Sequence, residues 1–154
     1  MKASHQLSRR SFADGFGVAL LAAGVAGAST SVLAAPSSAV TDMEACIDLC
    51  HRCETICLSM ATSYCLARGG AHAAPAHIRL MLDCAQICAT TAEFMARKSA
   101  HHARICRVCA EICMACAKSC DGLDGMEACL KLCRDCAESC RRMAEMGDGV
   151  TPRS

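Results

Sequence analysis

The sequence predicts an all-α protein, an antiparallel up-down-up-down four-helix bundle with a cysteine-lined core. Turn signals, glycine and proline at two of three breaks, divide the chain after its N-terminal segment into four stretches of helical length. Within each stretch, Cys and Met recur at alternating steps of three and four residues, which is the spacing of inward positions in a bundle. No stretch shows the sustained alternation and β-branched enrichment that mark a strand.

Four helices are expected, over residues 41–68, 76–98, 101–121 and 125–146. The breaks between them are two glycines followed by Pro75, the tract at Ser99, and the Asp-Gly sequence at 121–125. Asp124 can serve as the N-cap of the fourth helix. Because the connections are short, neighbouring helices should run antiparallel.

The inward positions of these helices carry sulfur where most bundles carry aliphatic side chains. ACIDLCHRCETIC at residues 45–57 and its near repeat ACLKLCRDCAESC at residues 128–140 show the spacing most clearly. All but one of the 16 cysteines fall on this seam. They are Cys46, Cys50, Cys53, Cys57, Cys84, Cys88, Cys106, Cys109, Cys113, Cys116, Cys120, Cys129, Cys133, Cys136 and Cys140. The other seam positions are Met43, Met60, Tyr64, His77, Met81, Thr91, Met95, His102, Met126 and Met143, which leaves Cys65 off the seam.

A row of thiols on one seam needs a chemical explanation. A single buried Cys usually acts as a small hydrophobic residue, but a core of Cys buries less area than one of Leu and would hold helices together poorly. The even Cys count suggests disulfides. Thiols one turn apart on a helix point in parallel, however, and pair badly. A disulfide-locked structural bundle stays open as an alternative.

A soft metal ion explains the spacing best. Thiolate and thioether ligands select Cu(I), Zn(II) or iron–sulfur clusters, and structural zinc and iron–sulfur sites usually take their cysteines from turns or loops. Because unpaired buried thiolates are very unfavourable, charge matching predicts roughly one Cu(I) per Cys. The Cys-x3-Cys pairs expected to hold an ion are Cys46/Cys50, Cys53/Cys57, Cys84/Cys88, Cys109/Cys113, Cys116/Cys120, Cys129/Cys133 and Cys136/Cys140. A metallothionein-like role in detoxifying zinc or other soft metals is the alternative.

Weaker ligands gather at the ends of the expected sulfur column. One end is expected to bring together Met60, Tyr64, Cys65, His77, Met81, Cys120, Met126 and Cys129, and the other Met43, Met95, His102 and Met143. Thioether and imidazole groups suit a mouth that passes ions inward, and the His77–Met81 spacing of one helical turn favours the first end. The predicted metal ligands are therefore all 16 cysteines together with Met60, His77, Met81 and Met126.

Residues 1–35 are expected to form a cleaved twin-arginine signal peptide, which leaves a copper-binding bundle domain at residues 36–150. SRRSF at residues 8–12 is the twin-arginine motif, and a Gly/Ala-rich apolar run with small residues near Ala34 follows it. An uncleaved membrane anchor is the alternative, although the run is short and Gly-rich. Since this route exports folded proteins, the sequence predicts a periplasmic protein that leaves the cytosol with its thiols occupied.

The Cys-lined bundle with Met and His near one end resembles the bacterial copper storage proteins, and the signal resembles that of their exported branch. The resemblance covers residues 42–146. It implies a Cu(I) store with the cysteines as ligands, a homo-oligomer built as a tetramer of bundles, and a copper-accepting enzyme or chaperone as partner. The second helix departs from the pattern, since Thr91 stands where a third Cys would lie.

Other functional classes fit less well. A thiol oxidoreductase needs one exposed Cys of low pKa, usually on a βαβ scaffold, so no catalytic residue is expected. The net charge of +1 gives no indication of a nucleic-acid partner. After signal cleavage no apolar run approaches the length needed to span a membrane, so no membrane insertion is expected.

Overall fold

The structure is a computed structural model that describes residues 38–148 of the 154-residue chain. The predicted signal peptide at residues 1–35 lies outside the described residues, as do both ends of the predicted 36–150 domain. The described part consists of helices and turns, without a strand. None of its helices combines the length and the apolar character that a membrane span requires.

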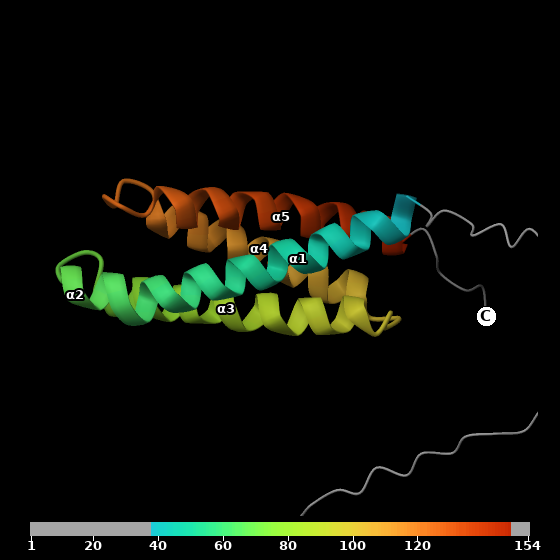
Figure 1. Cartoon of the computed structure of the whole chain (residues 1–154), viewed down its shortest axis with the longest axis horizontal. Helices are drawn as coiled ribbons and strands as arrows, with labels where there is room; N and C mark the ends of the chain where they lie inside the picture. The colour runs from blue at the N-terminus through green and yellow to red at the C-terminus, as the bar shows by residue number, and fades with distance from the viewer. Residues whose placement is uncertain (1–37, 149–154) are drawn as a thin grey trace, which may run out of the picture. The chain divides into compact units, whose positions relative to one another are not determined.

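Four long helical segments follow one another in the chain (Figure 1). They are α1 (Ser38–Ser59), continued without a break by η1 (Met60–Cys65) and α2 (Leu66–Arg68), then α3 (Pro75–Ala96), α4 (His102–Cys120) and α5 (Glu127–Asp148). Pro75 stands in the first turn of α3, where its missing N–H removes no helical hydrogen bond. The predicted N-cap at Asp124 is wrong, because α5 begins at Glu127 and the Asp124 carboxylate binds Arg68 instead.

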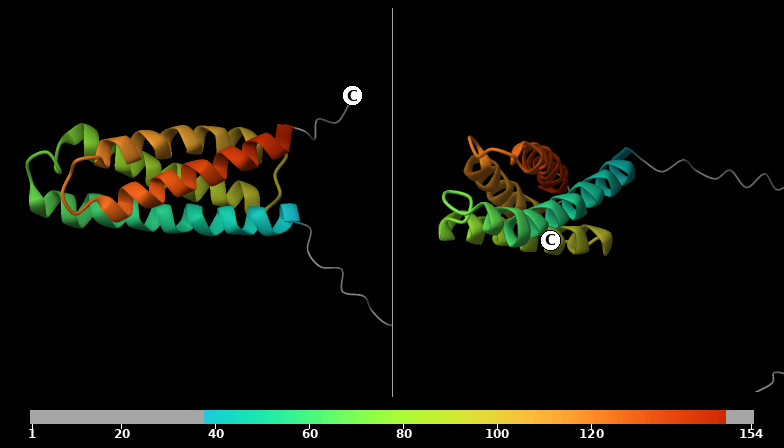
Figure 2. Two further views of the ribbon diagram at one scale, coloured as in Figure 1. Left: turned by 90° about the horizontal axis from the view of Figure 1, so that it is seen from above. Right: turned by 60° about the vertical axis from the view of Figure 1, so that its left-hand side comes forward.

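Each long helix packs against two others. α1 packs on α3 and α5, and α4 packs on the same two helices. Successive helices run in opposite directions in Figure 1 and again in Figure 2, where the connecting loops lie alternately at the two ends of the bundle. The predicted antiparallel up-down-up-down four-helix bundle is confirmed.

The first bundle helix changes phase near its C-terminal end. η1 is a π-helix, which has more residues per turn than an α-helix and turns the buried face onto Ala61 and Cys65. The prediction that Cys65 lies off the seam is wrong, since Cys65 is fully buried, whereas Met60 and Tyr64 are only half-buried. Cys57 and Cys65 are separated by two steps of four residues, which would rotate them about 80° apart in a regular α-helix.

Small side chains complete the core. The buried side chains of residues 38–148 are Cys, Met and Ala, together with His77, Thr91 and Ser139. Four of the alanines directly follow a seam cysteine: Ala85, Ala110, Ala117 and Ala137. Partly buried aliphatic residues surround this core: Ile47, Ile56, Ile78, Leu80, Ile87, Ile112, Leu123, Leu130 and Leu132. The larger aliphatic side chains thus surround the core, and cysteine, methionine and alanine side chains occupy its centre.

Candidate metal centre

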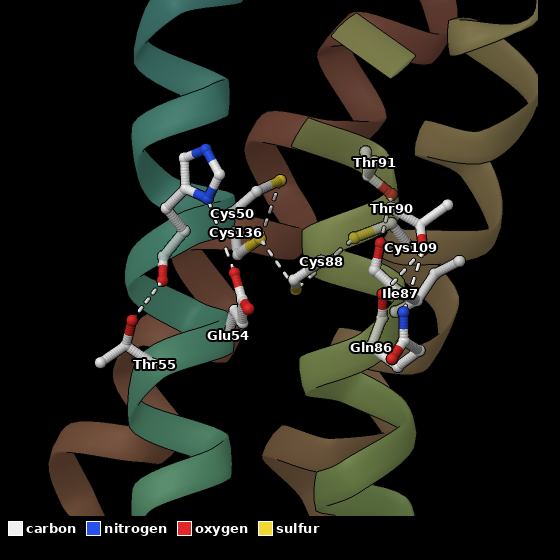
Figure 3. Close-up of polar contacts among 11 residues, drawn as sticks. Cys50, Glu54, Thr55, Gln86, Ile87, Cys88, Thr90, Thr91, Cys109 and Cys136 are labelled. Atoms are coloured by element: carbon white, nitrogen blue, oxygen red, sulfur yellow. Dashed lines mark hydrogen bonds and ion pairs between the residues drawn. The ribbon is translucent and has the colours of Figure 1, made fainter. Parts of the chain in front are cut away.

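The 16 cysteines form a buried column along the centre of the bundle. Every one is at most 1% exposed, and all are free thiols. Sulfur contacts connect all four helices, as Figure 3 shows. Cys136 in α5 lies 3.8 Å from Cys50 in α1 and 3.9 Å from Cys88 in α3, measured between Sγ atoms. Cys88 in turn lies 3.8 Å from Cys109 in α4.

Four groups of four thiols have all their Sγ atoms within 4.8 Å of one another. They are Cys50/Cys109/Cys136/Cys140, Cys53/Cys57/Cys84/Cys133, Cys53/Cys88/Cys113/Cys136 and Cys57/Cys116/Cys129/Cys133. Four cysteines belong to two groups each: Cys53, Cys57, Cys133 and Cys136. A thiolate shared by two groups can bridge two ions, so the groups form a continuous chain instead of four separate sites.

The sulfur separations suit thiolate ligands of a soft metal ion. The contacts range from 3.4 Å for Cys88–Cys113 to 4.0 Å for Cys84–Cys133. A metal–sulfur bond of about 2.3 Å implies a sulfur–sulfur separation of about 3.8 Å at a tetrahedral ion and about 4.0 Å at a trigonal one. The thiols are therefore close to ligand spacing before any ion binds.

Most of these contacts run between helices. The predicted pair Cys109/Cys113 is in contact at 3.8 Å within α4, and Cys53/Cys57, Cys129/Cys133 and Cys136/Cys140 share a four-thiol group. Each group nevertheless takes ligands from at least three helices. Ligand sets therefore extend beyond the Cys-x3-Cys pairs that the spacing suggests.

Contacts between thiols shift their pKa values in opposite directions. Hydrogen bonds from Cys140 and Cys50 lower the pKa of Cys46 to about 4, although burial raises it. The pKa of Cys57 is raised, chiefly by its contacts with Cys116 and Cys129 and further by burial. In each contact one sulfur holds the proton and favours the ionised form of its neighbour. The column therefore holds protons that a metal ion has to displace.

At the α2 end, the column finishes in a mixed group of sulfur and nitrogen atoms. Cys65 Sγ lies 3.8 Å from His77 Nε2, 3.9 Å from Met81 Sδ and 3.7 Å from Met126 Sδ. His77 Nδ1 lies 2.7 Å from Ser119 Oγ. When Nδ1 carries the ring proton and donates it to Ser119, Nε2 presents its lone pair toward Cys65. The structure thus brings together Cys65, His77, Met81 and Met126, all predicted for this end.

Met60 is the exception among the metal ligands predicted at this end. It is half-buried and lines a surface groove with Ile56 and Leu132, between α1 and α5. The π-helical turn that carries Cys65 inward is the reason, because it leaves Met60 outside the buried face. The structure does not bring Met60 into the sulfur column.

The opposite end of the column also carries buried thioether side chains. Met95 and Met143 are buried there together with Ala144. His102, predicted on the seam, is half-buried, and its Nδ1 donates to the carbonyl oxygen of Ser99 at 2.7 Å. The two ends therefore differ in their histidines, because His77 lies against a cysteine sulfur whereas His102 is bonded to the backbone.

Comparison with known proteins identifies the family. The sequence profile of the copper storage proteins matches residues 39–145. The chain belongs to this family. A search of curated proteins gave no match.

Three solved relatives of this copper storage protein share its fold. A protein of Nitrosospira multiformis is 52% identical, with 69% of this chain and 97% of that chain covered and a TM-score of 0.68. The Bacillus copper storage protein Csp3, solved with Cu(I) bound, is 40% identical, with coverages of 67% and 98% and a TM-score of 0.61. A cytosolic copper storage protein of Streptomyces lividans, solved with five coppers, is 25% identical, with coverages of 74% and 98% and a TM-score of 0.53.

Sequence reasoning misses Ser119, and it predicts Cys65 as a ligand but places it off the buried seam. Ser119 precedes Cys120 and lies off the cysteine seam, so only the fold reveals its contact with His77. Cys65 requires the π-helix, for which the two consecutive steps of four from Cys57 are the one visible signal. Ser119 orients a ligand and Cys65 supplies one, so both belong to the mouth end of the column.

Proposed function

We propose that this chain stores Cu(I) in its bundle core, at roughly one ion per cysteine, and that it does so without catalysis. The observation that carries the proposal is the continuous buried column of free thiols at ligand spacing, with shared sulfurs between neighbouring groups. Bridging thiolates need about one monovalent cation each to neutralise a buried core. Cu(I) meets this charge requirement, whereas Zn(II) would meet it with half as many ions.

The stoichiometry of loading tests this function directly. We expect anaerobic titration with Cu(I) to bind about one ion per cysteine, because charge neutrality sets the limit. Thiol reagents applied to the denatured protein should find every cysteine free before loading and masked afterwards. Atomic absorption gives the number of copper ions bound per chain, and a titration with Zn(II) is the matched comparison.

Saturation at one to four copper ions would contradict the storage proposal. Preferential retention of Zn(II) in competition with Cu(I) would favour the zinc-detoxification role. An absence of free thiols in the metal-free protein would favour the disulfide-locked bundle.

Copper loading is expected to depend on pH. Thiols with raised pKa, such as Cys57, are protonated at neutral pH and must each release a proton to bind Cu(I), whereas Cys46, with a pKa lowered to about 4, is already ionised. The apparent affinity should therefore rise with pH and fall on acidification, by up to about tenfold per pH unit for each proton displaced. Proton release during loading, measured in weakly buffered solution, checks this, and loading without proton release would contradict it.

We also propose that the group of Cys65, His77, Met81 and Met126 is the mouth of the store. Its support is the spacing of 3.7–3.9 Å from Cys65 to each partner, together with the contrast between His77, which lies against Cys65, and His102 at the opposite end, which is bonded to the Ser99 carbonyl oxygen. Imidazole and thioether are neutral ligands, so they hold a Cu(I) ion less tightly than thiolates do. An ion bound here would be passed on readily to the thiols beyond.

The export of the protein, its tetramer and its copper acceptor are further proposals. The twin-arginine motif at residues 8–12 supports export to the periplasm, and the family match begins only at residue 39. The resemblance to exported copper storage proteins supports a homotetramer and a copper-accepting enzyme or chaperone. Cell fractionation and the molar mass of the protein in solution would test the first two, and recovery of copper in the cytosolic fraction alone would argue against export.

A further inference from the structure

Two side chains at the end of the first bundle helix and one in the loop that follows it contact the turn before α5. Arg68 donates to Asp124 Oδ2 at 2.8 Å, and Tyr64 Oη donates to the Asp124 carbonyl oxygen at 3.0 Å. His72 Nε2 donates to the same carbonyl at 2.9 Å. The Tyr64 ring also meets His72 edge-on at 5.8 Å between centroids and lies 5.9 Å from the Arg68 guanidinium carbon. We call these three side chains with Asp124 and Gly125 the clasp.

Gly125 shows how closely the clasp is fitted. Its φ is +76°, in the left-handed region that favours glycine. A Cβ atom at this position would lie 2.2 Å from Tyr64 Oη, well inside contact distance. The Tyr64 ring therefore lies directly on the backbone of the turn, and only glycine leaves room for it.

The clasp is joined by the chain to the ligands of the mouth. Tyr64 precedes Cys65 in the π-helix, and Gly125 precedes Met126. Cys65 and Met126 are buried and in contact at 3.7 Å. The clasp contacts therefore lie between half-buried or exposed residues, of which Tyr64 and Gly125 are each one peptide bond from a buried ligand. Movement of the turn away from Tyr64 must also move Met126 away from Cys65.

We propose that the clasp is a gate that controls the rate at which Cu(I) passes through the mouth. This inference rests on the proposed storage function and on the mouth at the α2 end. Closed, the clasp holds Cys65 and Met126 together over the column; open, it separates them and admits a copper carrier or chelator. A gate changes the activation free energy for copper transfer and leaves the free-energy difference between the loaded and the empty protein unchanged. Loading and unloading should therefore accelerate by the same factor when it is weakened, at constant capacity.

Two matched pairs of variants test the gate. Tyr64→Phe removes the hydrogen bond to Asp124, and its control Thr62→Val removes the bond from Thr62 Oγ1 to Leu58 O in the same helix. Arg68→Gln removes an ion pair and a contact with an aromatic ring, and its control Arg97→Gln removes the equivalent contacts with Glu93 and Phe94. Arg97 follows α3 at the opposite end of the bundle.

We expect Tyr64→Phe to accelerate both loading with Cu(I) and its removal by bathocuproine disulfonate by about fivefold, the effect of losing one hydrogen bond. Arg68→Gln should act in the same direction with a smaller factor, since its ion pair is exposed. Both controls should keep the wild-type rates, and all variants should keep the wild-type capacity.

Equal transfer rates in the clasp variants and their controls would contradict the proposal that the clasp is a gate. Faster transfer in Arg97→Gln would contradict the proposal that the gate lies at the α2 end. A fall in capacity without acceleration would also contradict the gate, because that outcome indicates a structural role alone. Amide hydrogen exchange at Gly125 and Met126 in the metal-free protein gives a readout independent of copper. Faster exchange in Tyr64→Phe supports opening of the clasp, even if the measured stoichiometry contradicts the storage proposal. Unchanged exchange contradicts opening of the clasp.

Discussion

Full loading with Cu(I) should raise the free energy of unfolding by an amount on the order of tens of kcal/mol. A ligand that binds only the folded state at 100 times its dissociation constant contributes about 2.7 kcal/mol per site. The column offers thiols for many ions at once, all positioned by the fold. Thiols of the unfolded chain also bind copper, which reduces the gain but does not bring ligands from three or four helices together.

The metal-free bundle should be much less stable than the copper-loaded one. Its core contains Cys, Met and Ala in place of large aliphatic and aromatic side chains, so burial of apolar area contributes less to its stability. We expect unfolding in guanidinium, followed by circular dichroism, to show a helical metal-free protein with a much lower midpoint than the loaded one. Mg²⁺, a hard ion that prefers oxygen ligands, is the control and should leave the midpoint unchanged. Equal midpoints with and without Cu(I) would show that the thiols are not the principal ligands.

The bundle and most of its column are predictable because they depend on a repeated spacing. The steps of three and four that place Cys46, Cys50, Cys53 and Cys57 on one face also predict their burial, and the structure confirms it. Glycine and proline mark two of the three breaks between helices, because they act on the local backbone. The alanines that follow four of the seam cysteines were visible in the sequence as well, but their role depends on how closely the helices pack.

The mouth is less predictable because it depends on contacts distant in sequence. A π-helical turn changes which side of the helix faces the core between Ser59 and Leu66. A rule based on regular spacing therefore predicts that Tyr64 is buried and Cys65 is not, whereas the structure shows the reverse. Asp124 has the side chain of an N-cap, yet it pairs with Arg68, 56 residues earlier in the chain. Such pairings follow from which loops the fold brings to one end of the bundle, and the local sequence does not encode them.

Replacing one shared sulfur should remove more copper than replacing one terminal sulfur. Cys136 belongs to two of the four-thiol groups and contacts Cys50 and Cys88, whereas Cys46 belongs to none of the four and contacts Cys140 at 3.7 Å. Serine matches cysteine in size, but its hydroxyl oxygen is a poor ligand for a soft ion. Charge matching alone predicts the loss of about one ion from either variant. We expect Cys136→Ser to lose about two, since two groups each lose a ligand, and Cys46→Ser to lose about one.

The two variants are matched in burial, because both cysteines are 0% exposed. Any difference in copper content therefore reflects their positions in the column and not their accessibility. Native mass spectrometry of loaded protein resolves single ions, and the unfolding midpoint of each metal-free variant shows whether the substitution alone destabilises the bundle. A loss of one ion from both variants would mean that the thiols act as independent sites. If Cys136→Ser loses copper from groups beyond its own two and Cys46→Ser does not, the ions form one connected cluster. The sulfurs that neighbouring groups share would then hold this cluster together.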